Sequence, residues 1–218
     1  MGLTAMRKNA LSKQRIVEAA IEILDNEGES ALTFRALATR LATGAGAIYW
    51  HVADKNELLS ATTEHVVVPA ITHSASEPGD AIRAIALGIF DTMDAHPWVG
   101  AHLSRAPSQT AILAIIERLG AQLLELEVPE KHLFSAGSAL GNYILGVAGQ
   151  NAANARLLPA GTDRVDFLTA VANEWSQLDA DQYPFVRRVA RQLAEHDDRE
   201  QFLAGVDLIL DGIANLPR

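Results

Sequence analysis

The chain has 218 residues, of which 49% are hydrophobic, and its formal net charge is −9 at neutral pH. This length and apolar content suit one large domain, or a small domain joined to a larger one, and they argue against an intrinsically disordered chain. Cysteine is absent, which excludes disulfide bonds, thiolate metal ligands and cysteine nucleophiles.

The N-terminus does not resemble a targeting segment. Its basic residues are not followed by the uninterrupted apolar run of a secretory signal peptide. Gly2 is followed at position 6 by Met6, where a myristoylation motif has Ser or Thr. No stretch approaches the ~18 uncharged apolar residues that a transmembrane helix needs. We therefore expect a soluble, cytoplasmic protein.

The charge is unevenly distributed along the chain. Residues 1–60 hold 7 basic and 7 acidic side chains, whereas residues 61–218 hold 11 basic and 20 acidic ones, so the whole acid excess follows residue 60. The first 15 residues contain no acid, and their basic residues are Arg7, Lys8, Lys13 and Arg15. This asymmetry predicts two parts with different partners.

Apolar residues recur at helical spacing through the N-terminal part and predict four helices. Ser12 is a favourable N-cap for the first helix, and Gly28 ends it. Thr33 can cap the second, and Asp54 with Glu57 three residues later forms a capping box for the fourth. The four helices are expected at residues 12–26, from residue 33 onward, at about 45–51 and at 54–69.

Turn-forming residues dominate the segment THSASEPGDA, residues 72–81, and predict a boundary there. Helical periodicity continues beyond it, and prolines punctuate the chain near the predicted helix ends. The last helix is expected to be broken near EHDDRE, residues 195–200. The helices of this part are expected at residues 79–95, 98–105, 108–125, 130–156, 162–178 and 184–216. The chain is therefore predicted to be all-α.

Ala42, Thr43 and Gly44 separate the second predicted helix from the third. A turn of three to four residues that contains glycine is typical of a helix-turn-helix, whose second helix enters the major groove of DNA. Ile48 and Val52 lie four residues apart and fit the core face of this helix. The segment is therefore interpreted as a DNA-binding unit.

Three aromatic rings, Tyr49, Trp50 and His51, end the third predicted helix. We expect them at its outer face or edge, where hydroxyl, indole and imidazole donors can bind phosphate oxygens. The alternative is that Tyr49 and Trp50 fill the domain core, because aromatic residues at helical spacing are usually buried.

Residues 33–59, TFRALATRLATGAGAIYWHVADKNELL, resemble the DNA-binding domain of tetracycline-repressor (TetR) family regulators. The resemblance spans about residues 12–60. It rests on a Thr-x-Arg opening, a glycine near the turn, an aromatic-rich recognition helix and a following Asp-Lys-x-x-Leu-Leu. The YWHV segment places the chain near the tetracycline repressor-like branch. The resemblance implies a homodimer on a palindromic operator, with recognition helices ~34–36 Å apart.

The resemblance also implies a division of labour along the chain. Residues 1–60 would form the helix-turn-helix DNA-binding domain with a basic arm in residues 1–11. Residues 61–78 would be a connecting helix and linker, and residues 79–218 a ligand-binding and dimerisation domain. The expected function is a ligand-responsive transcriptional regulator, a repressor released by an unknown small-molecule inducer, without a cofactor.

The family's DNA-binding positions carry over unevenly. Thr33 and Arg35 match positions that contact a phosphate and a guanine edge. Positions that touch or flank the DNA backbone are matched by Thr43, Tyr49, Trp50, His51 and Lys55.

The start of the recognition helix departs from the family pattern. Ala45, Gly46 and Ala47 have no side-chain donors, so they offer methyl contact to thymine or close backbone approach rather than bidentate base contacts. We expect base reading to depend on these methyl groups, on the arginine of the second helix and on the N-terminal arm. Arg7 and Lys8 of the arm could reach a minor groove, although a disordered tail is the alternative.

Residues 130–156 form a predicted helix unusually rich in glycine and alanine, although an interior glycine costs ~1 kcal/mol relative to alanine. Such a helix favours close approach by another. The resemblance implies that residues about 130–156 and 184–216 form a four-helix bundle across the homodimer. The apolar stripe of the last helix could equally be core within one subunit. That stripe consists of Phe202, Leu203, Val206, Ile209, Leu210 and Ile213.

A ligand pocket is expected between the helices of residues 79 to about 150. Its candidate lining residues are Ile85, Phe90, Met93, Trp98, His102, Leu103, Ile112, Ile116, Leu119 and Tyr143. The segment around His102 is similar to one in which the tetracycline repressor binds the magnesium of its drug. However, Arg118 stands where that repressor has Gln, and a cation would disfavour a metal chelate. We therefore favour a hydrogen-bonded pocket or surface His102 over a metal ligand and predict no metal site.

The sequence contains no recognisable enzyme motif, neither a nucleophile elbow nor a zinc-binding helix nor a phosphate-binding loop. We therefore expect no enzymatic activity. One alternative to the repressor is a dimeric helical protein that binds a ligand or another protein and has lost operator binding. The Ala-Gly-Ala start of the recognition helix keeps this alternative open.

Overall fold

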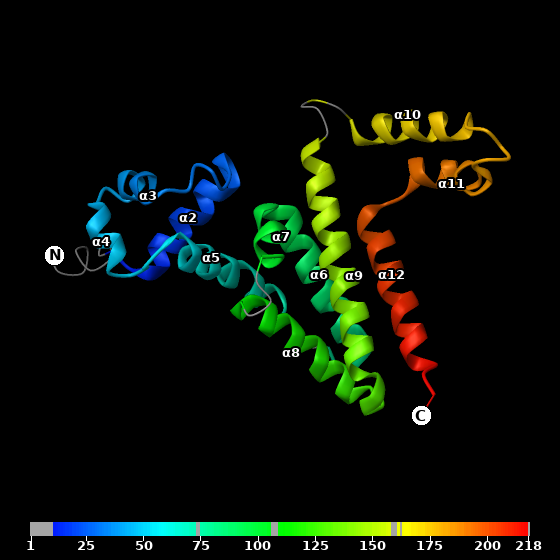
Figure 1. Ribbon diagram of the computed structural model, residues 1–218, viewed down its shortest axis with the longest axis horizontal. Helices are drawn as coiled ribbons and strands as arrows, with labels where there is room; N and C mark the ends of the chain where they lie inside the picture. Colours follow the sequence, from blue (N-terminus) through cyan, green and yellow to red (C-terminus); the bar gives the residue numbers. More distant parts are fainter. Residues whose placement is uncertain (1–10, 73–74, 106–108, 158–160, 162, 218) are drawn as a thin grey trace.

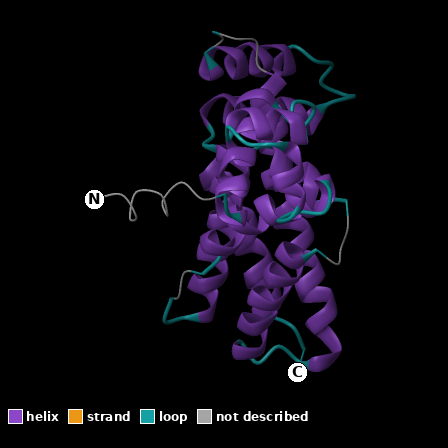
Figure 2. Cartoon of the chain, turned by 90° about the vertical axis from the view of Figure 1, so that its left-hand side faces the viewer, coloured by secondary structure: helices purple, strands orange, loops and turns teal. Residues whose placement is uncertain are grey.

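The computed structural model describes residues 11–72, 75–105, 109–157, 161 and 163–217. This part of the chain is helical and contains no strand, as the sequence predicted (Figure 2). None of its helices is long and apolar enough to cross a lipid bilayer.

The first helices form a small N-terminal domain at one end of the molecule (Figure 1). Two of them begin at capping hydroxyls. The Ser12 Oγ accepts a hydrogen bond from the Arg15 backbone N–H (3.3 Å), and the Thr33 Oγ1 accepts one from Ala36 (3.1 Å). These caps satisfy backbone groups that a helix start leaves without partners. The helices are α2 (Lys13–Glu27), α3 (Phe34–Arg40) and α4 (Ala45–Tyr49).

Helix α5 (Lys55–Ala70) connects this domain to the rest of the molecule. It begins with the predicted capping box: Asp54 accepts from the Glu57 backbone N–H (2.9 Å), and the Glu57 carboxylate accepts from that of Ala53 (2.7 Å). Helix α5 packs against α2 and also against α6, α7 and α8. Its buried residues therefore belong to one hydrophobic core that continues from the N-terminal domain into the C-terminal one.

The C-terminal part is a bundle in which α6 is central. Helix α6 packs against α5, α8, α9 and α12, so the apolar residues on most of its surface are buried. Two further helices, α10 and α11, pack on each other and project from the end where α9 stops and α12 starts (Figure 1). The helices are α6 (Pro78–Ala95), α7 (Trp98–Leu103), α8 (Thr110–Glu125), α9 (Glu130–Leu157), α10 (Arg164–Ser176), α11 (Pro184–Glu195) and α12 (Asp198–Ala214).

Helix boundaries differ from the predictions mainly at the helix ends. Helix α4 ends at Tyr49 rather than at residue 51, and α7 ends at Leu103 rather than at residue 105. The predicted final helix is interrupted, as expected, within EHDDRE. The physical reason is a new cap: Asp197 accepts a hydrogen bond from the Glu200 backbone N–H (2.8 Å) and starts α12.

The left-handed residue in the turn of the helix-turn-helix is Ala42 and not Gly44. Gly44 has an ordinary φ of −84° and serves as the N-cap of α4. Ala42 instead adopts a φ of 51°, in the left-handed region that usually favours glycine. The turn therefore places alanine where glycine would fit better, and the glycine that marks the motif in the sequence is not the residue that needs conformational freedom.

We expect Ala42→Gly to raise the free energy of unfolding by up to about 1 kcal/mol, because glycine avoids most of the side-chain penalty in the left-handed region. Denaturant unfolding followed by circular dichroism measures the change. Ala153→Gly, at an exposed interior position of α9, is the control and should lower stability by about 1 kcal/mol. Equal destabilisation by both substitutions would contradict the left-handed turn.

Candidate DNA-binding surface and ligand cavity

The outer face of α4 carries two aromatic side chains. Ile48 and Val52 are buried, whereas the Trp50 side chain is 90% exposed. The Tyr49 ring is 55% exposed and stacks on the Phe34 ring of α3, with centroids 4.4 Å apart and planes 4° from parallel. The alternative that Trp50 fills the core is therefore wrong. Its indole N–H and the Tyr49 hydroxyl are free to face a partner.

The first turn of α4 presents small groups only. Ala45 and Gly46 are exposed and Ala47 is half-buried. A Cβ added at Gly46 would meet no atom within 4 Å. This face therefore offers methyl groups and backbone at short range, and it has no side-chain donor or acceptor for a base edge.

Two cations of the N-terminal domain are paired with carboxylates. Lys13 pairs with Glu57 (2.8 Å), and Arg40 pairs with Glu22 (3.0 Å). By contrast, the exposed Arg35 guanidinium makes no hydrogen bond or ion pair within the described residues. Arg35 is thus the cation of α3 that remains available for a ligand of opposite charge.

The remaining predicted DNA-binding residues differ in availability. Thr33 is exposed and its hydroxyl oxygen caps α3, while Thr43 and His51 are half-buried. Lys55 was predicted to touch or flank the DNA backbone. In the structure its ammonium instead donates a hydrogen bond to the Glu29 backbone carbonyl in the loop after α2 (2.8 Å). Arg7 and Lys8 lie outside the described residues.

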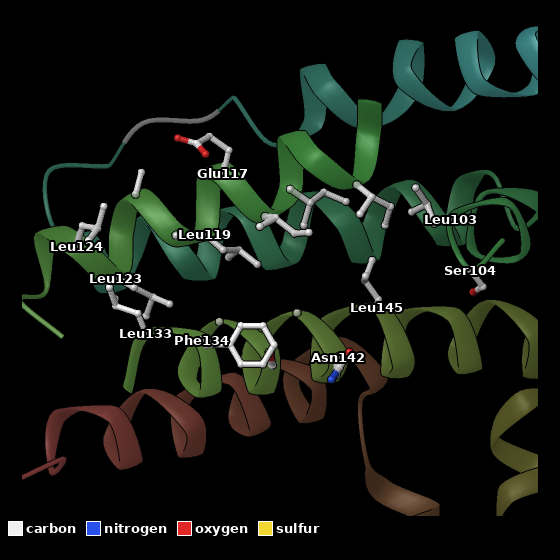
Figure 3. A pocket seen from close by; sticks show the side chains of 18 residues that line it. Leu103, Ser104, Glu117, Leu119, Leu123, Leu124, Leu133, Phe134, Asn142 and Leu145 are labelled. Carbon is white, nitrogen blue, oxygen red and sulfur yellow. The ribbon is translucent and has the colours of Figure 1, made fainter. Parts of the chain in front are cut away.

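A cavity of about 610 Å³ lies between α8 and α9, beside the end of α7 (Figure 3). Its lining is mainly aliphatic, with Ser104, Glu117, Ser138 and Asn142 as the polar contributors, and none of its lining residues is a cation. The volume and the apolar lining are typical of sites for drug-sized molecules. Its other lining residues are Leu103, Ile112, Ile115, Ile116, Leu119, Gly120, Ala121, Leu123, Leu124, Leu133, Phe134, Gly137, Gly141 and Leu145.

The cavity includes four of the predicted pocket residues: Leu103, Ile112, Ile116 and Leu119. Six others do not line it. Ile85, Met93, Trp98 and His102 are buried in the core, since α6 and α7 are covered by neighbouring helices. Phe90 and Tyr143 line a second cavity of about 430 Å³ beside α12.

The sequence placed α9 at the pocket only through Tyr143, which does not line this cavity. Ser138, Asn142 and Leu145 face the cavity from one side of that helix. The detectable signal was the pair Gly137 and Gly141, four residues apart on the same face, where the absence of side chains leaves room between α8 and α9. The sequence analysis had interpreted such glycines only as contacts for another helix.

Two family models together match most of the chain. Residues 16–62 match the model of bacterial regulatory proteins of the tetR family, and residues 78–216 match that of the tetracyclin repressor-like C-terminal domain. The chain belongs to the TetR family. It is therefore a helix-turn-helix transcriptional regulator that binds DNA, as its resemblance had implied.

Individual relatives agree with this assignment. A TetR-type transcriptional regulator from Streptomyces coelicolor is 54% identical and has a TM-score of 0.89, with 96% of this chain and all of that chain covered. A helix-turn-helix transcriptional regulator from Saccharopolyspora erythraea is 32% identical over 64% of this chain and 60% of its own length. The class C tetracycline repressor from Escherichia coli is 35% identical over 37% of this chain and 36% of its own length. The chain thus spans less than two thirds of these two curated relatives.

In this TetR-family protein, the buried His102 has an imidazole ring without a hydrogen-bond partner among the described residues. The residue is 4% exposed, and neither ring nitrogen has a partner among the described residues. The expectation of a hydrogen-bonded His102 was therefore wrong. Arg118 is exposed and does not line the cavity. Within the described residues, no group of three His, Asp or Glu side chains is placed to hold a metal ion.

Burial lowers the pKa of His102 below its ordinary value, and the nearby Arg105 guanidinium lowers it further. The folded protein therefore keeps this ring neutral at pH values where the unfolded chain binds a proton. Unfolded imidazole titrates near pH ~6.5, so acidification through that value favours the unfolded state.

We expect His102→Leu to reduce the loss of unfolding free energy between about pH 7.5 and 5.5. At the higher pH it should be neutral or stabilising, because no buried hydrogen-bond partner of His102 is left unpaired. Denaturant unfolding of wild type and variant at both pH values measures the difference. His65→Gln, at an exposed position of α5, is the control. An unchanged acid sensitivity in His102→Leu would contradict the neutral buried ring.

Proposed function

We propose that this regulator is a repressor that binds a palindromic operator as a homodimer and leaves it when a small molecule enters the cavity between α8 and α9. The observation that carries the DNA-binding part is the exposed Trp50 at the end of α4, together with the exposed Arg35 of α3, which has no ion pair within the described residues. A soluble domain does not normally leave an indole 90% exposed, and such a ring suits contact with a phosphate or sugar.

Only a few side chains would contact the base edges that distinguish the operator sequence. Arg35 is placed to bind a guanine edge in a bidentate manner, and the methyl groups of Ala45 and Ala47 would contact thymine. Tyr49 and Trp50 would position the helix by contacting the DNA backbone. Gly46 would let the α4 backbone approach the groove closely, since no side chain separates them.

Exposed apolar residues on α9 and α12 support a second copy of the chain as a partner. Phe134 is 87% exposed and Leu208 is 74% exposed. The predicted interface stripe is only partly available, however: Phe202, Val206 and Leu210 are buried within the chain itself. The dimer contact proposed here therefore uses the opposite side of α12 together with α9.

The chemistry of the cavity limits the proposed inducer. With an aliphatic lining, one carboxylate and no cation, the cavity would favour a lipophilic molecule that is neutral or positively charged. Ser104, Ser138 and Asn142 can orient it through hydrogen bonds. An organic anion would lose hydration there without gaining a positive partner.

Release from the operator would follow from a population shift. The ligand would favour an orientation of α5 in which the two recognition helices no longer match successive turns of the groove. To favour release about 100-fold, it must prefer the released state by ~2.7 kcal/mol. The class C tetracycline repressor is similar to a shorter part of this chain than the other relatives are, and its name is consistent with such a role.

We expect Arg35→Ala and Trp50→Ala each to weaken binding to the operator upstream of the coding sequence by tenfold or more, since a good contact is worth about 1–3 kcal/mol. Fluorescence anisotropy across a salt series measures this, and Trp50→Ala should leave the salt slope unchanged because the indole carries no charge. Glu64→Ala, on the exposed surface of α5, is the control. A folded dimer without specific binding at any salt would favour the alternative protein that has lost operator recognition.

We expect Nile red, a neutral apolar dye, to bind in the cavity, and the anionic dye 1-anilinonaphthalene-8-sulfonate to bind much more weakly. Gly141→Phe should abolish Nile red binding, because an aromatic ring would occupy the space beside α9. Leu113→Phe is the control, since Leu113 is an exposed residue of α8 that does not line the cavity. Equal dye fluorescence in wild type and Gly141→Phe would show that the dye binds elsewhere.

A further inference from the structure

The second cavity, of about 430 Å³, differs in chemistry from the cavity between α8 and α9. It lies between α6, the C-terminal half of α9 and the start of α12, where α9 and α12 run side by side (Figure 1). Its volume falls within the range of about 300–1,000 Å³ that is typical of small-molecule sites. Its lining residues are Phe90, Tyr143, Val147, Gln150, Asn151, Asn154, His196, Asp198, Gln201 and Phe202.

Three aromatic rings form an apolar wall of this cavity. The Phe202 ring packs against the Phe90 ring, with centroids 4.8 Å apart, and it stacks on the Tyr143 ring, with centroids 5.8 Å apart and planes 13° from parallel. The Tyr143 hydroxyl donates a hydrogen bond to the Phe202 backbone carbonyl (3.0 Å). A Cβ at Gly205 would collide with the Tyr143 side chain, so this glycine leaves the room that the ring occupies. The aromatic wall is therefore fixed before any ligand binds.

Four side-chain amides also line the cavity. Gln150, Asn151 and Asn154 come from successive turns of α9, and Gln201 comes from the first turn of α12. None of the four amides has a hydrogen-bond partner within the described residues. Each amide has both donors and an acceptor. The cavity therefore offers several pairs of donor and acceptor that the described part of the protein leaves unused.

The charged groups at the cavity already balance one another. The Asp198 carboxylate pairs with the Arg164 guanidinium at the start of α10 (2.6 Å), and it lies 3.0 Å from the His196 Nε2. The His196 Nδ1 lies 2.6 Å from the Leu193 backbone carbonyl, which can only accept, so this nitrogen carries a proton. Among the described residues that line the cavity, none is a lysine or an arginine. A ligand with a net charge would therefore lose hydration without gaining an unpaired partner.

A fixed aromatic wall beside unengaged amides suits a flat heterocyclic ring. Such a ring can stack on an aromatic side chain, as nucleic-acid bases do. A planar amide can bind a neighbouring donor and acceptor on the edge of the ring, as asparagine and glutamine do with the N6 and N7 of adenine. Sugars share the hydrogen-bonding chemistry, but a flat face makes contact with an aromatic ring over more of its area than a puckered ring does.

We propose that the cavity beside α12 is a second small-molecule site, which takes an uncharged planar heterocycle with neighbouring hydrogen-bond donors and acceptors. The amides of Gln150 and Asn151 bind the edge of the heterocycle, and the aromatic wall contacts its face. This site is separate from the proposed inducer cavity, because the two share no lining residue. The inference goes beyond the proposed function and does not depend on it.

Isothermal titration calorimetry of the full-length protein without DNA tests the site with four probes. Adenosine, which is uncharged and has an N–H donor beside a ring acceptor, should bind. Caffeine is flat but lacks every N–H donor, and adenosine 5′-monophosphate is an anion, so each should bind at least about tenfold more weakly. Glucose offers hydroxyls without a flat ring and should not bind at the same concentration. Glucose binding tighter than adenosine binding would overturn the heterocycle.

Variants of the amides locate the binding. Asn151→Leu removes a half-buried amide at similar volume, and it should weaken adenosine binding about tenfold or more, because the edge of the ring loses a two-point contact. Gln150→Leu should act in the same direction. Asn173→Leu, at an exposed position of α10 outside the cavity, is the matched control and should bind adenosine as the wild type does. Circular dichroism of every variant establishes that it is folded.

The outcomes separate this site from the inducer cavity. Asn151→Leu should leave Nile red binding unchanged, because Asn151 does not line that cavity. Absence of adenosine binding by the wild type would overturn this inference and leave the repressor proposal intact. Wild-type adenosine affinity in the folded Asn151→Leu and Gln150→Leu variants would also overturn it, since the nucleoside would then bind elsewhere. Loss of the dimer in Asn151→Leu, measured by analytical ultracentrifugation, would overturn it too, because the amides would then face a second copy of the chain.

Discussion

Helix α5 belongs to the hydrophobic cores of both domains, and most other features of the molecule depend on this arrangement. Leu58 and Leu59 near its start are buried in the same continuous core as Val67 near its end. The hydroxyls of Thr62 and Thr63 between them both donate to the Leu59 carbonyl, so the buried middle of α5 needs no polar partner from another helix. Because α5 is packed into the cores of both domains, a rotation of one domain is transmitted through this helix to the other.

The distribution of charge between the two domains affects how strongly the protein is attracted to DNA. The acidic excess lies after residue 60, so the C-terminal domain and DNA repel each other. Within the N-terminal domain, ion pairs of Lys13 and Arg40 reduce the positive field. This charge distribution gives non-specific attraction to DNA little support, which fits the proposal that recognition depends on short-range contacts by Arg35, Trp50 and the small residues of α4.

The sequence predicted the N-terminal domain well because its signals are local. Ser12, Thr33 and Asp54 each cap a helix within three residues, and such contacts do not depend on the rest of the fold. The cavity was predicted less well. Ile85 and Met93 have the same helical spacing as true lining residues, and only the packing around α6 shows that they are core.

Two further features were beyond the sequence interpretation for different reasons. The left-handed turn residue is Ala42, although the turn contains a glycine, Gly44, that accepts this conformation more readily. The hydrogen bond from the Trp98 indole to Asp25 joins residues separated by more than seventy positions. Nothing in the periodicity of either helix indicates that partner, because side-chain pairing across domains depends on how α5 orients them.

The positions of the tryptophans give the molecule optical probes of its own. Trp50 lies in solvent on the recognition helix, and Trp98 is buried with its indole against Asp25. The emission of the first should respond to contact with DNA, and that of the second to separation of the two domains. Because their surroundings differ so strongly, a quencher in solution reaches the first ring and spares the second. Once the third tryptophan, the half-buried Trp175 of α10, is replaced by Phe, events at the operator and at the domain boundary can thus be followed separately without attaching a label.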